Sequence, residues 1–166
     1  MSNKIKIYLD TSVPNFLFAD DAPEKRDITI DLFENFIKTG IYDTYISEVV
    51  LAEIADTENE EKRTRLLNSI KKYAITIIEL TPQEQREAEE MAFKYIDAGI
   101  IPANKRADAL HIAITLVRRL DFLVSWNYKH LANINKEKKI KILNLQNNYN
   151  HDFRIITPIE LIDYGN

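Results

Sequence analysis

The stretch KIKIYLDTSVPNF, residues 4–16, decides the fold that this sequence predicts. Its first half alternates apolar and other residues, as a buried strand does, and the apolar ones are Ile5, Ile7 and Leu9. The strand then ends on the carboxylate of Asp10, followed by the hydroxyls of Thr11 and Ser12. Ligands of α/β sheets bind at such strand ends, but a strand-end aspartate can also cap the next helix. Asp10 is therefore a candidate site residue with a structural alternative.

Strand-like runs recur along the chain, and helix-like segments separate them. The predicted strands cover residues 4–9, 42–46, 74–80, 121–126 and 153–157. The predicted helices include residues 24–40, 57–73, 81–99 and 105–120. The third of these carries a capping box, with Thr81 as the cap and Glu84 three residues on. The alternation predicts crossover connections, hence an α/β fold with a mostly parallel sheet of about five strands and helices on both faces. We predict a single domain over residues 1–166.

Composition excludes several classes of site. The chain of 166 residues has no cysteine, which rules out disulfides and thiolate metal sites. Its three histidines are too far apart in sequence for a zinc motif, and its three glycines are too scattered for a phosphate-binding loop. No apolar run has the length of a membrane span or the form of a signal peptide, so we expect a cytoplasmic protein with no membrane partner.

The net charge of −4 argues against a general affinity for nucleic acid. Basic residues nevertheless gather between Tyr128 and Ile142, where five lysines face one acid, Glu137. This segment is either a local basic edge that meets a polyanion or an ordinary solvated helix face.

Glu53 lies among apolar residues in SEVVLAEI, residues 47–54. At about 100° per residue it projects between Val49 and Val50, inside the apolar arc of the predicted helix. An unpaired buried carboxylate costs several kcal/mol, so a residue without a role is expected on the outer face. We interpret Glu53 as a functional carboxylate. The structural alternative is a core salt bridge to an arginine or lysine.

Asp108 shows the same conflict in NKRADALHIAIT, residues 104–115. The segment is apolar nearly all round, as in a buried helix. Its polar exceptions fall at i, i+3 and i+7 and form one stripe of Asp108, His111 and Thr115. Asp108 also lies near the helix start, where the dipole favours an anion. We interpret Asp108 as functional, and His111 and Thr115 as supporting or hydrogen-bonded core groups.

Asp10, Glu53 and Asp108 would repel one another if the fold brought them together. The repulsion is relieved either by proton uptake or by a bound cation. Ligands that are all oxygen favour Mg²⁺ or Mn²⁺, and such an ion activates water and stabilises charge on a phosphodiester. On this hypothesis Asp10 is a metal ligand, while the hydroxyls of Thr11 and Ser12 orient it or contact a phosphate.

Four motifs in order resemble those of the PIN-domain family, and particularly the VapC-like toxins of type II toxin–antitoxin systems. They are YLDTSVPNFLF (8–18), SEVVLAEI (47–54), KRADALHIAIT (105–115) and DFLVSWNYKHL (121–131). The resemblance covers nearly the whole chain. It implies a three-layer α/β/α sandwich, a Mg²⁺- or Mn²⁺-dependent ribonuclease (a hydrolase), a homodimer and a cognate antitoxin protein. Carried over by position, the metal ligands would be Asp10, Glu53 and Asp108.

The fourth motif departs from the family pattern. Asn127 stands where the family often has aspartate, and His130 stands where it can carry another acid. Asn127 can assist catalysis by offering an oxygen or holding a metal-bound water, but it adds no charge, which weakens the case for a second metal. His130 can contact phosphate or protonate a leaving oxygen. On the alternative, Asn127 caps the next helix. Ser125 would support the carboxylates, and Lys105 and Arg106 would position the RNA.

Two functions stay open at this point. The first is a metal-dependent endoribonuclease that acts on RNA as the toxin of a toxin–antitoxin pair. The second is a catalytically weak or inactive PIN-like domain that binds RNA or a protein. A phosphatase of the haloacid-dehalogenase type fits poorly, because it needs an aspartate where Ser12 stands.

Overall fold

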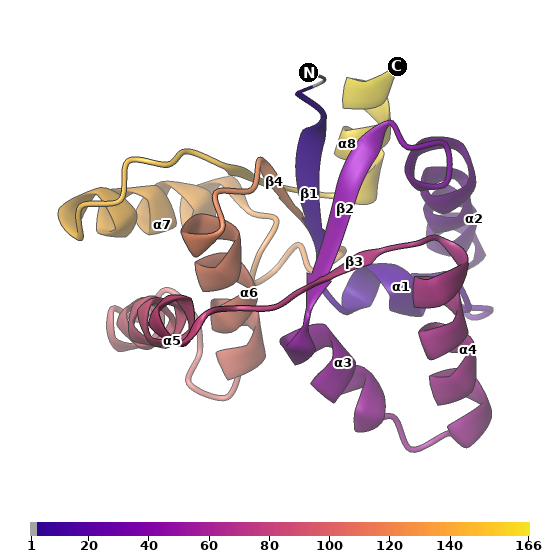
Figure 1. Ribbon diagram of the computed structural model, residues 1–166, viewed down its shortest axis with the longest axis horizontal. Helices are drawn as coiled ribbons and strands as arrows, with labels where there is room; N and C mark the ends of the chain where they lie inside the picture. Colours follow the sequence, from indigo (N-terminus) through magenta and orange to yellow (C-terminus); the bar gives the residue numbers. More distant parts are fainter. Residues whose placement is uncertain (1–2) are drawn as a thin grey trace.

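The computed structural model describes residues 3–166 and contains one five-stranded sheet (Figure 1). The strands lie in the order β3-β2-β1-β4-β5, and each pairs with its neighbours in parallel. They are β1 (Ile5–Leu9), β2 (Tyr42–Ser47), β3 (Thr76–Ile78), β4 (Phe122–Val124) and β5 (Arg154–Ile156). The five predicted strands and their parallel arrangement are therefore confirmed, although the last three are shorter than predicted.

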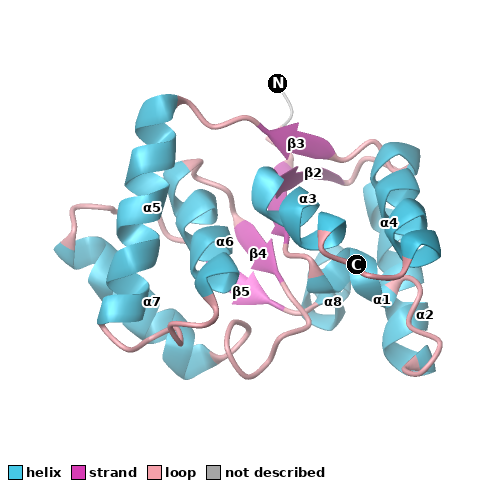
Figure 2. Cartoon of the chain, turned by 90° about the horizontal axis from the view of Figure 1, so that it is seen from below, coloured by secondary structure: helices cyan, strands magenta, loops and turns pink. Residues whose placement is uncertain are grey.

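Helices cover both faces of this sheet. They are α1 (Ser12–Phe16), α2 (Pro23–Leu32), a π-helical turn η1 (Phe33–Ile37), α3 (Glu48–Ala55), α4 (Glu60–Lys72), α5 (Pro82–Asp97), α6 (Arg106–Val117), α7 (Ile134–Gln146) and α8 (Pro158–Gly165). Figure 2 shows α5, α6 and α7 on one side of the sheet, and α1, α2, α4 and α8 on the other. The three-layer α/β/α sandwich is confirmed. Within residues 3–166, none of these helices combines the length and apolar character needed to cross a membrane.

The strand order places a topological switch point beside β1. From β1 the chain adds β2 and then β3 on one side, and it later adds β4 and β5 on the other. The carboxyl ends of β1 and β4 are therefore adjacent, with their following helices on different sides of the sheet. Asp10 follows β1 and Ser125 follows β4. The fold thus brings two polar residues that are far apart in sequence to the place where α/β sheets bind ligands.

Strand β1 lies at the centre of the core. Ile7, Tyr8 and Leu9 have no exposed surface, because helices cover both faces of the central strand. Burying an aliphatic side chain of this size stabilises the fold by about 1.5–3 kcal/mol. The backbone at Asp10 is therefore fixed by a rigid strand directly before it.

Two helices depart from the sequence-based prediction. The segment predicted as one helix over residues 24–40 continues from α2 into η1, where Lys38 N–H donates to Phe33 O at 2.9 Å. The segment PIELID, residues 158–163, is predicted as a single last turn, but it belongs to a full helix, α8. A second capping box explains its start, since Thr157 accepts from Glu160 N–H and Glu160 accepts from Thr157 N–H.

The predicted capping box of α5 is confirmed and gives a first testable prediction. Thr81 Oγ1 accepts from Glu84 N–H at 3.1 Å, and Glu84 Oε1 accepts from Thr81 N–H at 3.0 Å. Thr81→Ala leaves one helix N–H without its partner, so we expect the free energy of unfolding to fall by about 1 kcal/mol in urea denaturation. The exposed Arg86→Ala serves as control, with an expected change below about 0.5 kcal/mol. Equal losses in the two variants would contradict the prediction.

Candidate carboxylate site at the carboxyl edge of the sheet

Asp10 is buried at this edge, with 3% of its surface exposed. Its N–H donates to Val124 O at 3.1 Å, so pairing with β4 continues past the end of β1. Asp10 Oδ1 accepts from Ser12 N–H at 3.0 Å and from the Ser12 hydroxyl at 2.5 Å. Asp10 Oδ2 accepts from the Ser125 hydroxyl at 2.5 Å. Both carboxylate oxygens are thus held by donors from the two central strand ends.

The two serine hydroxyls have fixed orientations. Ser12 Oγ accepts from Trp126 N–H at 3.0 Å, and Ser125 Oγ accepts from Asn127 N–H at 2.9 Å. Each hydroxyl receives a backbone N–H and therefore gives its single proton to Asp10. Ser12 is also the first residue of α1, so Asp10 does bind the start of that helix, as the structural alternative proposed. Asp10 therefore binds the start of α1 and also occupies the candidate site.

Glu53 lies in α3 and is partly buried, with 37% of its side chain exposed. Its Oε1 accepts from the Thr11 hydroxyl at 2.6 Å and lies 2.8 Å from His111 Nε2. Within residues 3–166 no lysine or arginine nitrogen comes within 4.0 Å of this carboxylate. The alternative of a core salt bridge to arginine or lysine is therefore not what the structure contains. Glu53 is hydrogen-bonded to His111 and Thr11 instead.

A chain of buried hydrogen bonds continues from His111 to the start of α3. Tyr8 OH lies 2.7 Å from His111 Nδ1 and 2.6 Å from Ser47 Oγ, and Ser47 Oγ accepts from Val49 N–H at 3.2 Å. Because an ionised Glu53 only accepts, His111 Nε2 donates to it, and with a neutral imidazole Nδ1 is an acceptor. Tyr8 then donates to Nδ1, and Ser47 donates to Tyr8. Each proton donated in this series of hydrogen bonds then has one acceptor.

Sequence reasoning treated His111 as a supporting group but missed Tyr8. The available signal was the position of Tyr8 between Ile7 and Leu9 in the central strand. A tyrosine that is fully buried needs a partner for its hydroxyl. The sequence pattern therefore indicated a hydrogen bond there, but not with which residue.

Asp108 occupies the first turn of α6 and is partly exposed. Asn127 Nδ2 lies 3.5 Å from Asp108 Oδ2, while Asn127 Oδ1 accepts from His130 N–H at 3.0 Å. Asn127 thus caps the turn at residues 128–131 and not the next helix, which its structural alternative predicted, because the cap of α7 is Asn133. Its amide is directed toward Asp108. Lys105, directly before α6, is exposed.

The three carboxyl groups have different electrostatic environments. Burial raises the pKa of Asp10, and the charge of Asp108 raises it further, against the lowering effect of His111, Ser12 and Ser125. Burial also raises the pKa of Asp108, with a further contribution from the charge of Glu53. Burial opposes ionisation of Glu53 as well, but His111 and Thr11 outweigh it and lower the pKa of Glu53. Asp10 and Asp108 therefore carry charge at a cost that a nearby cation would offset.

The carboxylates do not form a ready-made cage of three ligands. Among residues 3–166, no group of three or more His, Cys, Asp or Glu side chains is arranged to hold a metal ion. Glu53 Oε1 is bound by Thr11 and His111. Mg²⁺, however, is commonly held by only one or two carboxylates together with waters and substrate phosphates. The oxygen ligands of Asp10 and Asp108 fit that pattern.

The other predicted site residues differ in how closely they approach these carboxylates. The charge of Lys105 lowers the pKa of Glu53 and Asp108, and His130 does so for Asp108. Thr11, Ser12 and Ser125 contact the carboxylates directly. Arg106 is exposed at the first position of α6, and within residues 3–166 it has no ion pair. The structure therefore brings every predicted residue except Arg106 into contact or electrostatic range of the site.

The overall fold is similar to a chain in the crystal structure of VapBC2 from Rickettsia felis bound to a DNA fragment from their promoter. The match has a TM-score of 0.56 and covers 92% of this chain and 98% of the other, at 16% sequence identity. At that identity the likeness shows the fold alone. The three-layer α/β/α sandwich expected from the four motifs is confirmed at that level. No family model matches the chain, and no curated protein matches it either.

Proposed function

We propose that this protein is a PIN-like, metal-dependent endoribonuclease that hydrolyses RNA phosphodiesters. One observation carries the proposal: Asp10 is a buried carboxylate at the switch point of the sheet, surrounded by hydroxyl and amide donors, with its pKa raised by burial and by Asp108. Within residues 3–166 it has no lysine or arginine partner. A buried charge kept without a basic partner, where ligands bind, indicates a functional group.

Each residue of the site has a separate role in the proposed reaction. Asp10 and Asp108 would hold Mg²⁺ or Mn²⁺, with Glu53 close to Asp108 as a further acidic group. The bound ion supplies activation of water and neutralisation of phosphodiester charge. Ser12 and Ser125 hold Asp10 in one orientation. Exposed Lys105 is placed to attract the RNA backbone, and His130 is the candidate for protonating the leaving oxygen.

Removal of the metal tests the proposal. We expect purified protein to cleave structured RNA in millimolar Mg²⁺ or Mn²⁺ and to lose this activity with excess chelator, since two carboxylates alone do not activate water. Gel analysis of end-labelled RNA measures the effect, and re-addition of Mn²⁺ should restore cleavage. DNA of the same sequence serves as the control substrate. Cleavage that persists at full rate in chelator would show that the chemistry does not depend on the proposed ion.

We further propose that the protein acts as the toxin of a toxin–antitoxin pair, with an antitoxin partner and a homodimeric state. The likeness to a chain of the VapBC2 complex supports this role, together with the four motifs. Expression in a bacterial host should arrest growth, and co-expression of a small neighbouring gene should relieve the arrest. Growth unaffected by an active nuclease would argue for a housekeeping role instead.

A second function is favoured by Asn127 and by the engagement of Glu53 with His111. Both reduce the number of acidic groups available to an ion, as in a domain that binds RNA or a protein without cleaving. Titration calorimetry separates the two functions. Binding of RNA without any binding of millimolar Mn²⁺ would favour the second.

A further inference from the structure

Lys25, at the start of α2, lies over three aromatic rings. Its Nζ is 5.3 Å from the ring centre of Phe16, 5.5 Å from that of Trp126 and 5.4 Å from that of Tyr128. We call these four residues the aromatic–lysine cluster. Neighbouring Arg26 pairs with two aspartates, whereas Lys25 has no carboxylate oxygen within 4.0 Å in residues 3–166. The positive charge of Lys25 is thus held by ring faces and stays available to an anion.

Tyr128 is the solvent-exposed ring of this cluster. It is 45% exposed, whereas Trp126 beneath it is 3% exposed. The two rings meet edge to face with centres 6.3 Å apart, and Phe16 packs on Trp126 at 5.7 Å. The exposed ring therefore stands on a rigid aromatic base. Such a ring provides a flat surface on which a nucleobase can stack.

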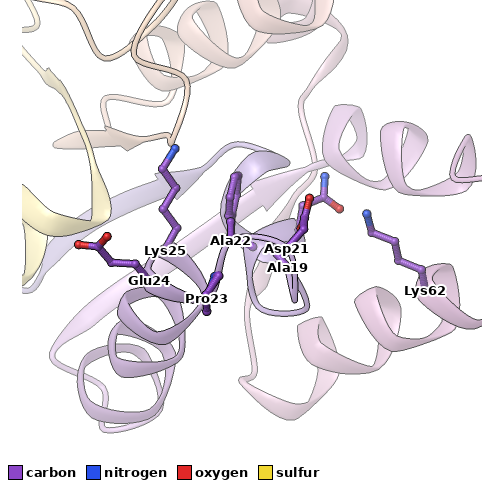
Figure 3. A pocket seen from close by; sticks show the side chains of 9 residues that line it. Ala19, Asp21, Ala22, Pro23, Glu24, Lys25 and Lys62 are labelled. Atoms are coloured by element: carbon purple, nitrogen blue, oxygen red, sulfur yellow. The ribbon is translucent and has the colours of Figure 1, made fainter.

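A hollow of about 620 Å³ adjoins the cluster and shares Phe16 and Lys25 with it. Figure 3 shows Lys25 and Lys62 on either side of the small residue Ala22. Asp21 and Glu24 also line the hollow, so two carboxylates balance its two ammonium groups. The hollow therefore does not attract a polyanion by net charge. Binding at the cluster must therefore depend mainly on stacking, with Lys25 as the contact for one phosphate.

The cluster is directly connected to the carboxylate site. Ser12, which donates to Asp10, begins α1, and Phe16 ends it, about 6 Å further along the helix axis. Trp126 N–H donates to Ser12 Oγ, and Tyr128 follows Asn127 by one residue. A strand whose phosphodiester lies at Asp10 can therefore place a neighbouring nucleotide on the cluster.

We propose that the aromatic–lysine cluster is a subsite for one unpaired nucleotide of a single-stranded nucleic acid. Its base stacks on Tyr128, and its phosphate meets Lys25. The inference rests on the proposed function, because that function brings a strand to the carboxylates. It adds a requirement for an unpaired base, since bases inside a duplex have no free face to offer.

Binding in the absence of cleavage tests the subsite. Fluorescence anisotropy in chelator compares a labelled single-stranded RNA with an abasic strand, a duplex and a DNA strand of the same sequence. We expect the two intact single strands, RNA and DNA alike, to bind better than the abasic strand and the duplex, because both offer a free base and a phosphate. Tyr128→Leu should weaken their binding on the order of tenfold, leave abasic binding unchanged and preserve the salt dependence. Tyr128→Phe, which keeps the ring, should bind as the wild type does. The control is Phe93→Leu, an aromatic residue 65% exposed on α5.

The single tryptophan gives a second, label-free measurement. Trp126 is the only tryptophan of the chain and packs against Tyr128, so a base that stacks there should change its fluorescence. Equal affinity of the wild type for base-containing and abasic strands would overturn the subsite, as would unchanged binding by Tyr128→Leu. Normal metal-dependent cleavage with either result would leave the proposed function standing. Base-dependent binding without any cleavage would instead support the subsite and refute the nuclease.

Discussion

Asp10→Asn is expected to reduce RNA cleavage at least about a hundredfold, because residues that only support a metal ligand already contribute 10- to 100-fold. The substitution keeps the shape of the side chain but removes one of the two charges that would attract the ion. Initial rates in saturating Mn²⁺ measure the effect. Differential scanning fluorimetry gives a second readout: Mn²⁺ should raise the melting temperature of the wild type and leave that of Asp10→Asn unchanged.

The fold should survive this substitution. Burial raises the pKa of Asp10, which means that the folded protein disfavours its charged form. A neutral amide removes this charge, while its Nδ2 cannot accept the proton that Ser125 gives to Oδ2; because these two effects oppose each other, the circular dichroism spectrum should match that of the wild type. Asp97→Asn, an exposed aspartate at the end of α5, is the matched control and should cleave normally. Equal cleavage by Asp10→Asn and the wild type would refute the assigned site.

Tyr8→Phe is expected to weaken Mn²⁺ binding about tenfold, the low end of the range for groups that support a metal site, because Tyr8 acts on Glu53 only through His111. The hydroxyl of Tyr8 joins Ser47 to His111, and His111 in turn bonds Glu53. Without it, His111 Nδ1 loses its hydrogen-bond partner and the imidazole is free to turn away from Glu53. Leaving a buried group unpaired should also lower stability by about 1–3 kcal/mol. Titration calorimetry and urea denaturation measure the two effects separately.

Tyr95→Phe separates a site effect from a stability effect. Tyr95 is also fully buried, and its hydroxyl donates to Asn144 Oδ1 at 2.5 Å between α5 and α7. The loss of stability should be similar, but Mn²⁺ affinity should not change, because neither residue contacts a carboxylate of the site. If Tyr8→Phe binds Mn²⁺ as tightly as Tyr95→Phe does, the hydrogen-bond chain has no part in holding the ion.

Residue spacing within a single strand or helix predicted the site residues whose position depends on that element alone. Strand periodicity placed Asp10 at the end of β1, and helix periodicity placed Asp108 in an apolar helix. The capping box of Thr81 was readable because its two partners are three residues apart. The hydrogen-bond partners of Asp10 and Tyr8 could not be predicted in this way. Ser125 and His111 lie 115 and 103 residues away from them, and no periodicity relates such distances.

The sequence by itself determined the alternation of strands and helices, the carboxyl-end position of Asp10 and the apolar surroundings of Glu53 and Asp108. These follow from side-chain spacing within a single strand or helix, which fixes the buried face. Only the tertiary structure decided that Glu53 bonds His111 rather than a lysine, and that Lys25 lies over three rings. Periodicity says which face is buried, but the neighbour that meets this face depends on strand order and helix packing, which arise only when distant segments come together.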